Sequence, residues 1–309
     1  MTKDLLSRIG NTPLVKPDNF LVSLDLDAQI YSKCEGFNPA GSIKDRAALF
    51  MIEDGEKSAK IKKDTVIIEA TSGNTGIGLA LVCAQRGYRL ILTMPDNMSV
   101  ERRALLKAMG AELVLTEAAK GMQGAVEQAV ELAATLPSAY IAGQFANPAN
   151  ANAHYWTTAP EIWQELEGKI DILVATIGSG GTISGCGRFF KEKNPGIHIV
   201  GVEPAESPLL SSGKAGPHII QGIGANFIPA ILNQKVIDEI VPVKGDTAVA
   251  MARLYGQTEG NLVGISSGAA LTAAIMLARR PEYVNKSIVA ILPDRGERYM
   301  STQLFEDKE

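Results

Sequence analysis

The sequence predicts an α/β protein with mostly parallel β-sheets and helices on both faces. Short runs of apolar or β-branched residues alternate with longer segments of helical period, which is typical of strand–helix–strand crossover units. The chain of 309 residues is 46% hydrophobic and 21% charged, the composition of an ordinary globular protein. Because a domain usually has about 100 to 200 residues, this length favours two lobes with a cleft between them.

Seven segments have the composition of buried strands, and turn-forming residues separate them from their neighbours. We expect strands at Thr65–Ala70, Tyr88–Met94, Glu112–Leu115, Ala139–Ala142, Asp171–Thr176, His198–Glu203 and Ser287–Leu292. Helices are expected between the early strands, at Asn74–Arg86, Val100–Met109 and Gly121–Ala134. Gly87 and Gly110 follow the first two helices, where a glycine adopts the left-handed capping conformation most easily.

Composition excludes several classes of function. A formal charge of −4 gives no electrostatic footprint for nucleic acid, and three scattered cysteines form no disulfide framework. The three histidines show no metal-binding spacing, so we expect no metal. The N-terminus lacks the apolar core of a signal peptide and no run of about 18 apolar residues occurs, which predicts a cytoplasmic protein. The long irregular stretch Pro204–Pro229 is more typical of a functional lid than of filler.

Lys44 falls in the first turn of a predicted helix, after a turn marked by Pro39 and Gly41. The positive end of the helix dipole disfavours a cation, so this amine should lose its proton more readily than that of a surface lysine. A neutral amine is the form that makes a Schiff base. A single lysine is more often a solvated surface charge, so the interpretation depends on the other loops.

Two further glycine-rich loops each join an apolar strand to a helix. The first, Glu69–Gly76, surrounds a helix N-terminus with hydroxyl and amide side chains, which suits a carboxylate or a phosphate but also suits ordinary helix capping. The second, Gly178–Thr182, presents successive glycine amides that could wrap a phosphate. It fits neither the dinucleotide-binding pattern nor the P-loop, which argues against NAD and ATP as ligands.

A rival motif is Gly264–Gly268, which matches the G-x-S-x-G elbow of α/β-hydrolases. That family places its histidine after the serine, and no histidine follows His218. A serine hydrolase is therefore disfavoured. An anion-binding protein without activity is a second alternative, but it would need no lysine beside the two loops.

In this order and spacing, the motifs resemble those of the fold-type II pyridoxal-phosphate (PLP) enzymes, specifically the O-acetylserine sulfhydrylase (cysteine synthase) family. The resemblance runs from Ile9–Leu14 to Pro293–Gly296 and covers nearly the whole chain. It implies a two-domain, tryptophan synthase β-like fold. Residues 1–45 and 152–309 would form the larger cofactor-binding domain, and residues 46–151 a smaller mobile domain that closes on the substrate.

The resemblance also assigns the site residues. It makes Lys44 the catalytic Schiff-base lysine, Asn74 the partner of the cofactor's ring hydroxyl, and Ser266 the hydrogen-bonding group at the pyridine nitrogen. The residues implied to hold the cofactor's phosphate are Gly178, Ser179, Gly180, Gly181 and Thr182. Those implied to hold the substrate carboxylate are Thr71, Ser72, Thr75 and Gln144.

The implied reaction is a β-replacement in which O-acetyl-L-serine and sulfide give L-cysteine and acetate through an α-aminoacrylate. Met94–Ser99 resembles the B-type isozyme and Ile220–Pro229 the A-type, so the second substrate stays open. Alternatives are a cysteine-consuming, sulfide-releasing reaction that forms serine or lanthionine, an O-phosphoserine-dependent enzyme and a cystathionine-forming relative. Ile219–Pro229 carries no cation, which favours acetylserine over phosphoserine. The resemblance further implies a homodimer and leaves open a serine acetyltransferase C-terminal tail as a partner.

Overall fold

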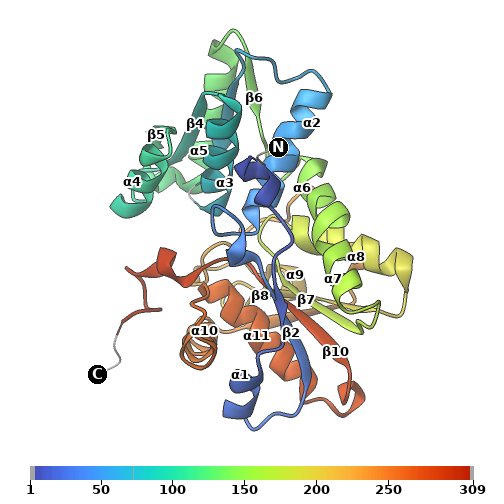
Figure 1. The fold of residues 1–309 in the computed structure, drawn as a ribbon. Helices are drawn as coiled ribbons and strands as arrows, with labels where there is room; N and C mark the ends of the chain where they lie inside the picture. Colours follow the sequence, from blue (N-terminus) through green and yellow to red (C-terminus); the bar gives the residue numbers. More distant parts are fainter. Residues whose placement is uncertain (1–3, 72, 307–309) are drawn as a thin grey trace. The chain divides into compact units, whose positions relative to one another are not determined.

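The computed structural model describes residues 4–71 and 73–306 of the chain. Contacts divide the chain into two compact units, the first made of Met1–Ile9 and Lys44–Asn150 and the second of Gly10–Ile43 and Ala151–Glu309. Each unit contains a mostly or wholly parallel β-sheet together with helices (Figure 1). The predicted fold class is therefore confirmed.

The first unit has a four-stranded sheet in the order β5-β4-β3-β6, and every pair in it is parallel. Its strands are β3 (Val66–Ala70), β4 (Leu90–Pro95), β5 (Glu112–Thr116) and β6 (Ala139–Ile141). Successive side chains of a strand point to opposite faces of the sheet. Val66, Ile68 and Ala70 pack with helix α5 (Gly121–Thr135), so Glu69 points to the other face.

Three helices of the first unit, α3, α4 and α5, begin and end close to the predicted residues, and a further helix, α2, precedes them. They are α2 (Lys44–Lys57), α3 (Asn74–Arg86), α4 (Val100–Ala108) and α5, with 3₁₀ turns η1 (Leu5–Arg8) and η3 (Ala118–Lys120). Gly87 ends α3 in the left-handed conformation, with φ of 75°, and Gly110 has φ of 88° after α4. Helices α2 and α3 pack so closely that a Cβ atom on Gly78 would lie 2.9 Å from the Lys44 carbonyl oxygen. Only glycine fits there.

The second unit has a six-stranded sheet in the order β1-β2-β10-β7-β8-β9. Its strands are β1 (Leu14–Val15), β2 (Gln29–Cys34), β7 (Ile172–Thr176), β8 (His198–Pro204), β9 (Glu239–Val243) and β10 (Ser287–Leu292). Only the β1–β2 pair among them is antiparallel. The carboxyl ends of the parallel strands therefore meet at one edge, where ligand-binding loops gather in such sheets.

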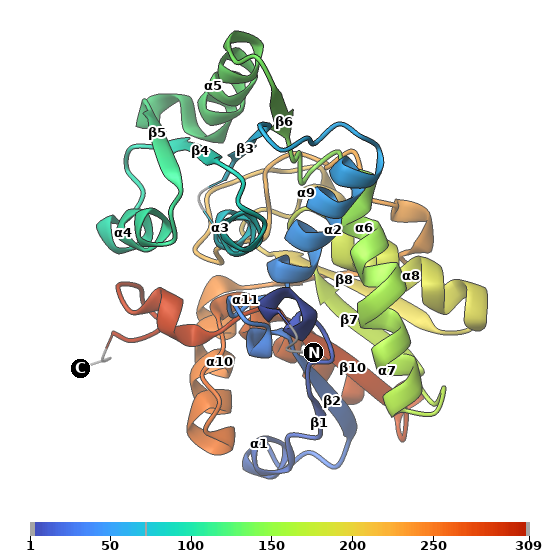
Figure 2. The same ribbon diagram turned by 45° about the horizontal axis from the view of Figure 1, so that its top comes forward.

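Helices cover both faces of this second sheet. Ile172 and Val174 pack with the cluster that includes α10 and α11, whereas Leu173 and Ala175 pack with α7 and α8 (Figure 2). The helices are α1 (Asp18–Ser23), α7 (Ala159–Glu165), α8 (Gly181–Lys193), α9 (Leu209–Ser212), α10 (Gly245–Glu259) and α11 (Ile265–Ala278). Short helical turns are η2 (Glu35–Phe37), the π-helical η4 (His154–Thr158), η5 (Gln234–Val236), η6 (Pro281–Tyr283) and η7 (Gly296–Tyr299). The chain leaves the first unit within α6 (Pro148–Ala153).

Three strands of the second unit were not among the predicted segments. Strand β2 contains a lysine, Lys33, whose side chain is nonetheless buried, because it forms ion pairs with Glu161 at 3.0 Å and Glu165 at 2.8 Å. Strand β9 contains Pro242, which a strand tolerates at the edge of a sheet, and β9 is such an edge. The third, β1, has only two residues. Neither a buried charge nor an edge proline produces an apolar run in the sequence.

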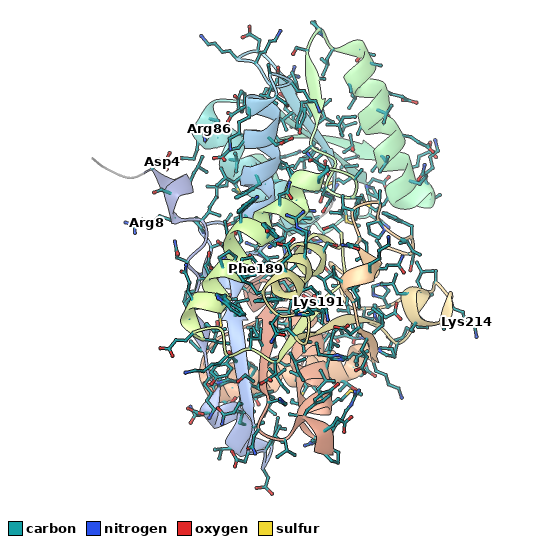
Figure 3. The ribbon with its side chains drawn as sticks, turned by 90° about the vertical axis from the view of Figure 1, so that its right-hand side faces the viewer. Asp4, Arg8, Arg86, Phe189, Lys191 and Lys214 are labelled. Atoms are coloured by element: carbon teal, nitrogen blue, oxygen red, sulfur yellow. The ribbon has the colours of Figure 1, made fainter. Side chains whose placement is uncertain are left out.

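After Pro204, the last residue of β8, the segment up to residue 229 contains one short helix, α9, and is otherwise irregular. Glu203, at the end of β8, accepts hydrogen bonds from the backbone N–H groups of Leu210 at 2.8 Å and Ser211 at 3.0 Å. Lys214, which follows α9, is exposed (Figure 3). A buried carboxylate at a strand end thus holds the start of this loop while its tip reaches solvent.

Candidate active site

The loop after β3 leads directly into α3 and gathers several polar side chains at the start of that helix. Thr71 and Thr75 are buried, and Ser72 lies outside the described residues. The residue before the helix, Gly73, has no side chain to cap it, and the first N–H groups of a helix have no partner within it. The start of α3 is therefore able to receive an anionic group.

Thr75 and Gln144 meet, although 69 residues separate them in the sequence. The Thr75 hydroxyl donates a hydrogen bond of 2.6 Å to Gln144 Oε1, and both side chains are buried. Gln144 follows β6, the strand paired with β3. The parallel pairing of β3 and β6 thus brings together two of the residues predicted for the substrate carboxylate.

Lys44 is the first residue of α2 and keeps only part of its surface exposed. Burial lowers the pKa of its amine to about 8, and the carboxylate of Glu69 opposes this shift. A lysine with an ordinary pKa near 10.4 is almost wholly charged at neutral pH. Lys44 therefore presents a larger neutral fraction, which is the nucleophilic form of an amine.

In the second unit, Gly178–Thr182 joins β7 to α8. A Cβ atom on Gly178 would lie 2.3 Å from the Gly222 carbonyl oxygen, so no larger residue fits the present backbone. Gly180 precedes α8 in the left-handed conformation, with φ of 83° and no side-chain cap. The N-terminus of α8 is thus lined by backbone amides, which is the arrangement that binds phosphate groups.

Ser266 is buried and is the second residue of α11. A nucleophile elbow instead holds its serine on a strained turn between a strand and a helix. Close packing explains the two glycines of this motif. A Cβ atom on Gly268 would lie 1.9 Å from the Ala248 carbonyl oxygen of α10, and a Cβ atom on Gly264 would lie 2.1 Å from Asp294 Oδ1. The local geometry does not support the hydrolase alternative.

Comparison with known proteins identifies the family. The profile of the family described as "Pyridoxal-phosphate dependent enzyme" matches residues 5–294. The chain belongs to this family. It is 51% identical over 297 residues to the Cysteine synthase B of Campylobacter jejuni, covering 96% of each chain.

Solved structures agree with this assignment. A cysteine synthase (OASS) from Entamoeba histolytica has a TM-score of 0.96 and 44% identity, covering 100% of this chain and 92% of that one. A hydrogen sulfide-producing enzyme from Fusobacterium nucleatum has a TM-score of 0.91 and 45% identity, covering 97% of this chain and 100% of that one. This chain is thus similar to these enzymes over nearly its whole length.

The residues present fit PLP, the cofactor of the family. The glycine-lined start of α8 suits the cofactor's phosphate, and a lysine of lowered pKa suits its aldehyde. In the first unit the structure places Lys44, Thr71, Asn74, Thr75 and Gln144 at the starts of α2 and α3 and after β6. In the second it places residues 178–182 after β7, and Ser266 on α11, which packs against β7.

Glu69 belongs to this region of the first unit, but the sequence alone assigned it no function. It is buried, and its carboxylate accepts hydrogen bonds from the backbone N–H groups of Gly143 at 2.6 Å and Gln144 at 3.2 Å. Burial raises the pKa of Glu69 to about 7, against the effect of these hydrogen bonds. The available signal was a single charged residue within the otherwise apolar run of β3.

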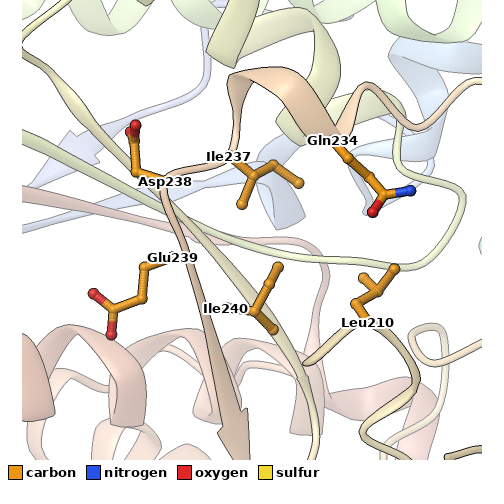
Figure 4. A pocket seen from close by; sticks show the side chains of 6 residues that line it. All are labelled: Leu210, Gln234, Ile237, Asp238, Glu239 and Ile240. Atoms are coloured by element: carbon orange, nitrogen blue, oxygen red, sulfur yellow. The ribbon is translucent and has the colours of Figure 1, made fainter. Parts of the chain in front are cut away.

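A pocket of about 200 Å³ in the second unit contains none of the predicted site residues. The residues that line it are Leu210, Gln234, Ile237, Asp238, Glu239 and Ile240 (Figure 4). Its carboxylates are already paired, Asp238 with Lys191 at 2.7 Å and Glu239 with Arg280 at 2.6 Å. It lies at the amino end of β9, whereas ligands of such sheets bind at the carboxyl ends. We therefore do not regard it as the active site.

The three cysteines are buried, and none of them is in a disulfide bond. Burial raises the pKa of Cys34 to about 11 and that of Cys83 to about 12, so these thiols do not ionise at neutral pH and are poor nucleophiles. Within residues 4–71 and 73–306, no helix combines the length and hydropathy needed to cross a bilayer.

Proposed function

We propose that this chain is a PLP-dependent β-replacement enzyme that converts O-acetyl-L-serine and sulfide to L-cysteine and acetate. The observation that carries the proposal is Lys44, whose lowered pKa occurs in the same unit as a helix N-terminus surrounded by buried hydroxyl and amide groups. Relatives named as cysteine synthases, similar over nearly the full length, support the same reaction.

In this proposal each residue predicted to bind the cofactor contacts a particular part of it. Lys44 carries PLP, Asn74 bonds its ring hydroxyl, and Ser266 bonds its pyridine nitrogen. Gly178, Ser179, Gly180, Gly181 and Thr182 hold its phosphate. When bound, PLP supplies an electron sink that acidifies the α-proton of an attached amino acid.

Lys44 also moves the protons of the reaction. With O-acetylserine held through its amino group, Lys44 Nζ would take the α-proton, and the bond between the β-carbon and the acetoxy oxygen would break, so that acetate leaves. After sulfide has added to the β-carbon, Lys44 Nζ would return a proton to the α-carbon. In the cofactor-free protein the pKa of this amine is lowered to about 8, and an acid–base group works best when its pKa lies near the working pH.

The substrate's carboxylate binds at the start of α3. Thr71, Ser72, Thr75 and Gln144 are the side chains proposed for it, together with the N–H groups that begin the helix. The dipole of α3 favours a negative charge at that end. Fixing the carboxylate holds the α-carbon at one place relative to Lys44, which is also in the first unit.

Titration of the purified protein tests the proposal. The protein should absorb visible light, its spectrum should change on adding O-acetyl-L-serine, and adding sulfide should restore the first spectrum while cysteine and acetate appear in equal amounts. A colourless protein that produces no cysteine in the presence of PLP would rule out the proposed reaction.

A second candidate is the reverse use of the same chemistry, in which cysteine is consumed and sulfide is released. The similarity to the hydrogen sulfide-producing enzyme of Fusobacterium nucleatum favours including it. One assay compares these alternatives by measuring turnover with three sets of substrates. They are cysteine alone, O-phosphoserine with sulfide, and O-acetylserine with homocysteine. The substrate pair with the highest kcat/KM identifies the reaction.

We further propose that the enzyme is a cytoplasmic homodimer whose smaller lobe, residues 46–151, moves when substrate binds. The family resemblance supports these points. It leaves open the C-terminal tail of a serine acetyltransferase as a partner. Light scattering tests the dimer, and competition between such a peptide and O-acetylserine tests the partner.

A further inference from the structure

A buried carboxylate lies next to the proposed carboxylate site without a role in the reaction above. Glu69 is 2% exposed and points to the face of its sheet opposite α5. Burying a carboxylate is unfavourable unless several hydrogen bonds compensate for the lost water. The presence of a buried ionisable group here, next to a site for a negative charge, therefore needs an explanation.

The hydrogen bonds of Glu69 all lead to the same short segment. Its two carboxylate oxygens accept from the backbone N–H groups of Gly143 and Gln144, at 2.6 and 3.2 Å. The Gln144 side chain also lies close enough to lower the pKa of this carboxylate. Gly143 has φ of 68°, a conformation that favours glycine. Glu69 thus holds a sharp turn and the residue that follows it.

The contact with Thr75 and the nearby carboxylate of Glu69 both favour one orientation of the Gln144 side-chain amide. Above its pKa of about 7, Glu69 is ionised and only accepts hydrogen bonds, so it favours the orientation in which the Gln144 side chain turns an N–H toward it. Gln144 Oε1 is then left to accept the hydroxyl of Thr75, as observed at 2.6 Å. The amide nitrogen carries two hydrogens, so one N–H remains that can face a ligand's carboxylate.

Resting on the proposed function, we infer that Glu69 is a positioning residue of the substrate-carboxylate site. It holds the Gly143–Gln144 backbone and keeps the amide N–H of Gln144, rather than its oxygen, available to the substrate. A purely structural role would stabilise the fold without affecting ligands differently. The two roles are therefore separable by ligands that differ only in the carboxylate.

The test compares Glu69→Gln with Glu112→Gln. Glu69→Gln keeps the shape of the side chain but introduces an N–H donor, so the Gln144 amide is free to turn over. Glu112 is an exposed glutamate of the same unit, paired with Arg89 at 2.6 Å, and serves as the matched control. Both variants are loaded with PLP, and their cofactor content and thermal unfolding are compared with those of the parent protein.

The ligands are L-alanine and ethylamine. Neither carries a leaving group, and ethylamine is L-alanine without its carboxylate. Binding is followed by the cofactor's absorbance. We expect Glu69→Gln to weaken L-alanine binding at least fivefold and to change ethylamine binding less than twofold, while Glu112→Gln changes neither. An equal loss for both ligands, or no loss for L-alanine, would overturn the inference.

Two further measurements separate positioning from a general loss of structure. Hydrogen exchange at the Gly143 and Gln144 amides should be faster in Glu69→Gln, whether or not PLP is bound. If Glu69 acts through Gln144, adding Gln144→Ala to Glu69→Gln should cost much less L-alanine affinity than Gln144→Ala costs alone, since coupled residues are not additive. Unchanged exchange, or full additivity, would contradict the inference.

A shorter variant covers the case in which Glu69→Gln does not fold. Glu69→Asp keeps the charge and accepts only, so its loss of L-alanine affinity should exceed that of Glu112→Gln while ethylamine binding stays within twofold. Failure of the proposed function is a different result. A parent protein that binds L-alanine but makes no cysteine contradicts the reaction, whereas the ligand comparison still decides the role of Glu69.

Discussion

Lys44 and Lys57 begin and end the same helix but have different surroundings. Lys57 is exposed and pairs with Glu53 at 3.3 Å, whereas Lys44 is desolvated, with a pKa of about 8. We predict that Lys44→Ala lowers turnover about a thousandfold or more, since it removes both the cofactor's attachment and the acid–base group. Lys57→Ala should retain the parent rate of acetate release. A Lys44→Ala protein with near-parent turnover would disprove the assignment.

Two neighbouring serines of α11 offer a similar comparison. Ser266 is proposed to bond the pyridine nitrogen, while the buried Ser267 hydroxyl has no hydrogen-bond partner among the described residues. Ser266→Ala should remove one neutral hydrogen bond, worth about 1 kcal/mol, and lower kcat/KM by about tenfold or less. Ser267→Ala should have no such effect. A loss near a millionfold in an ester hydrolysis assay for Ser266→Ala would instead favour a serine hydrolase.

At the residue scale, the sequence predicted the groups that stand in glycine-rich loops. Lys44 and Thr75 became candidates because they follow turn signals at helix starts. Glu69 received no role because its partners, Gly143 and Gln144, are more than 70 residues away. Hydrogen bonds between segments so distant in sequence depend on the pairing of β3 with β6, which no local pattern reveals.

At the element scale, strands buried on both faces were predicted well. Ser287–Leu292 and the helix Asn74–Arg86 match the structure at both ends. The sequence missed β2 and β9 because their stability depends on partners elsewhere. Lys33 of β2 is compensated by glutamates of α7, and β9 tolerates Pro242 only because it lies at the edge of its sheet.

The segment 204–229 is the element for which we predict a change on substrate binding. Glu203 accepts hydrogen bonds from the backbone of its helix α9, while Lys214 is exposed and therefore accessible to proteases. If the segment is a lid, O-acetylserine should slow tryptic cleavage after Lys214 severalfold, because lids become ordered when they close. Cleavage after the exposed Lys63 provides the reference. Equal cleavage rates with and without substrate would indicate an ordinary surface loop.

At the scale of the whole molecule, each unit combines segments that are distant in the chain. The second unit joins Gly10–Ile43 to Ala151–Glu309, and its sheet places β2 between β1 and β10. Such long-range pairing forms slowly, because loop closure precedes the contacts that reward it. In the first unit, likewise, the titratable groups Glu69 and Lys44 become buried only when the strands have paired and the helices have packed. Their burial makes the stability of the unit depend on pH.

The sign of that dependence follows from the two pKa shifts. Folding raises the pKa of Glu69 to about 7, so the folded state binds more protons than the unfolded state between about pH 4.5 and 7, and the free energy of unfolding should fall as pH rises through this range. Folding lowers the pKa of Lys44 to about 8. The unfolded state then binds more protons between about pH 8 and 10.5, and stability should rise there.

Urea unfolding of the cofactor-free protein at several pH values measures both effects. We expect Glu69→Gln to lose the fall between pH 4.5 and 7 and Lys44→Met to lose the rise between pH 8 and 10.5, because neither replacement titrates. Glu112→Gln should keep both slopes, since Glu112 is exposed and its pKa is lowered by Arg89 rather than raised. If the parent and Glu69→Gln proteins have the same slope below pH 7, Glu69 titrates in the folded protein as it does in the unfolded chain, and its burial has no effect on its charge.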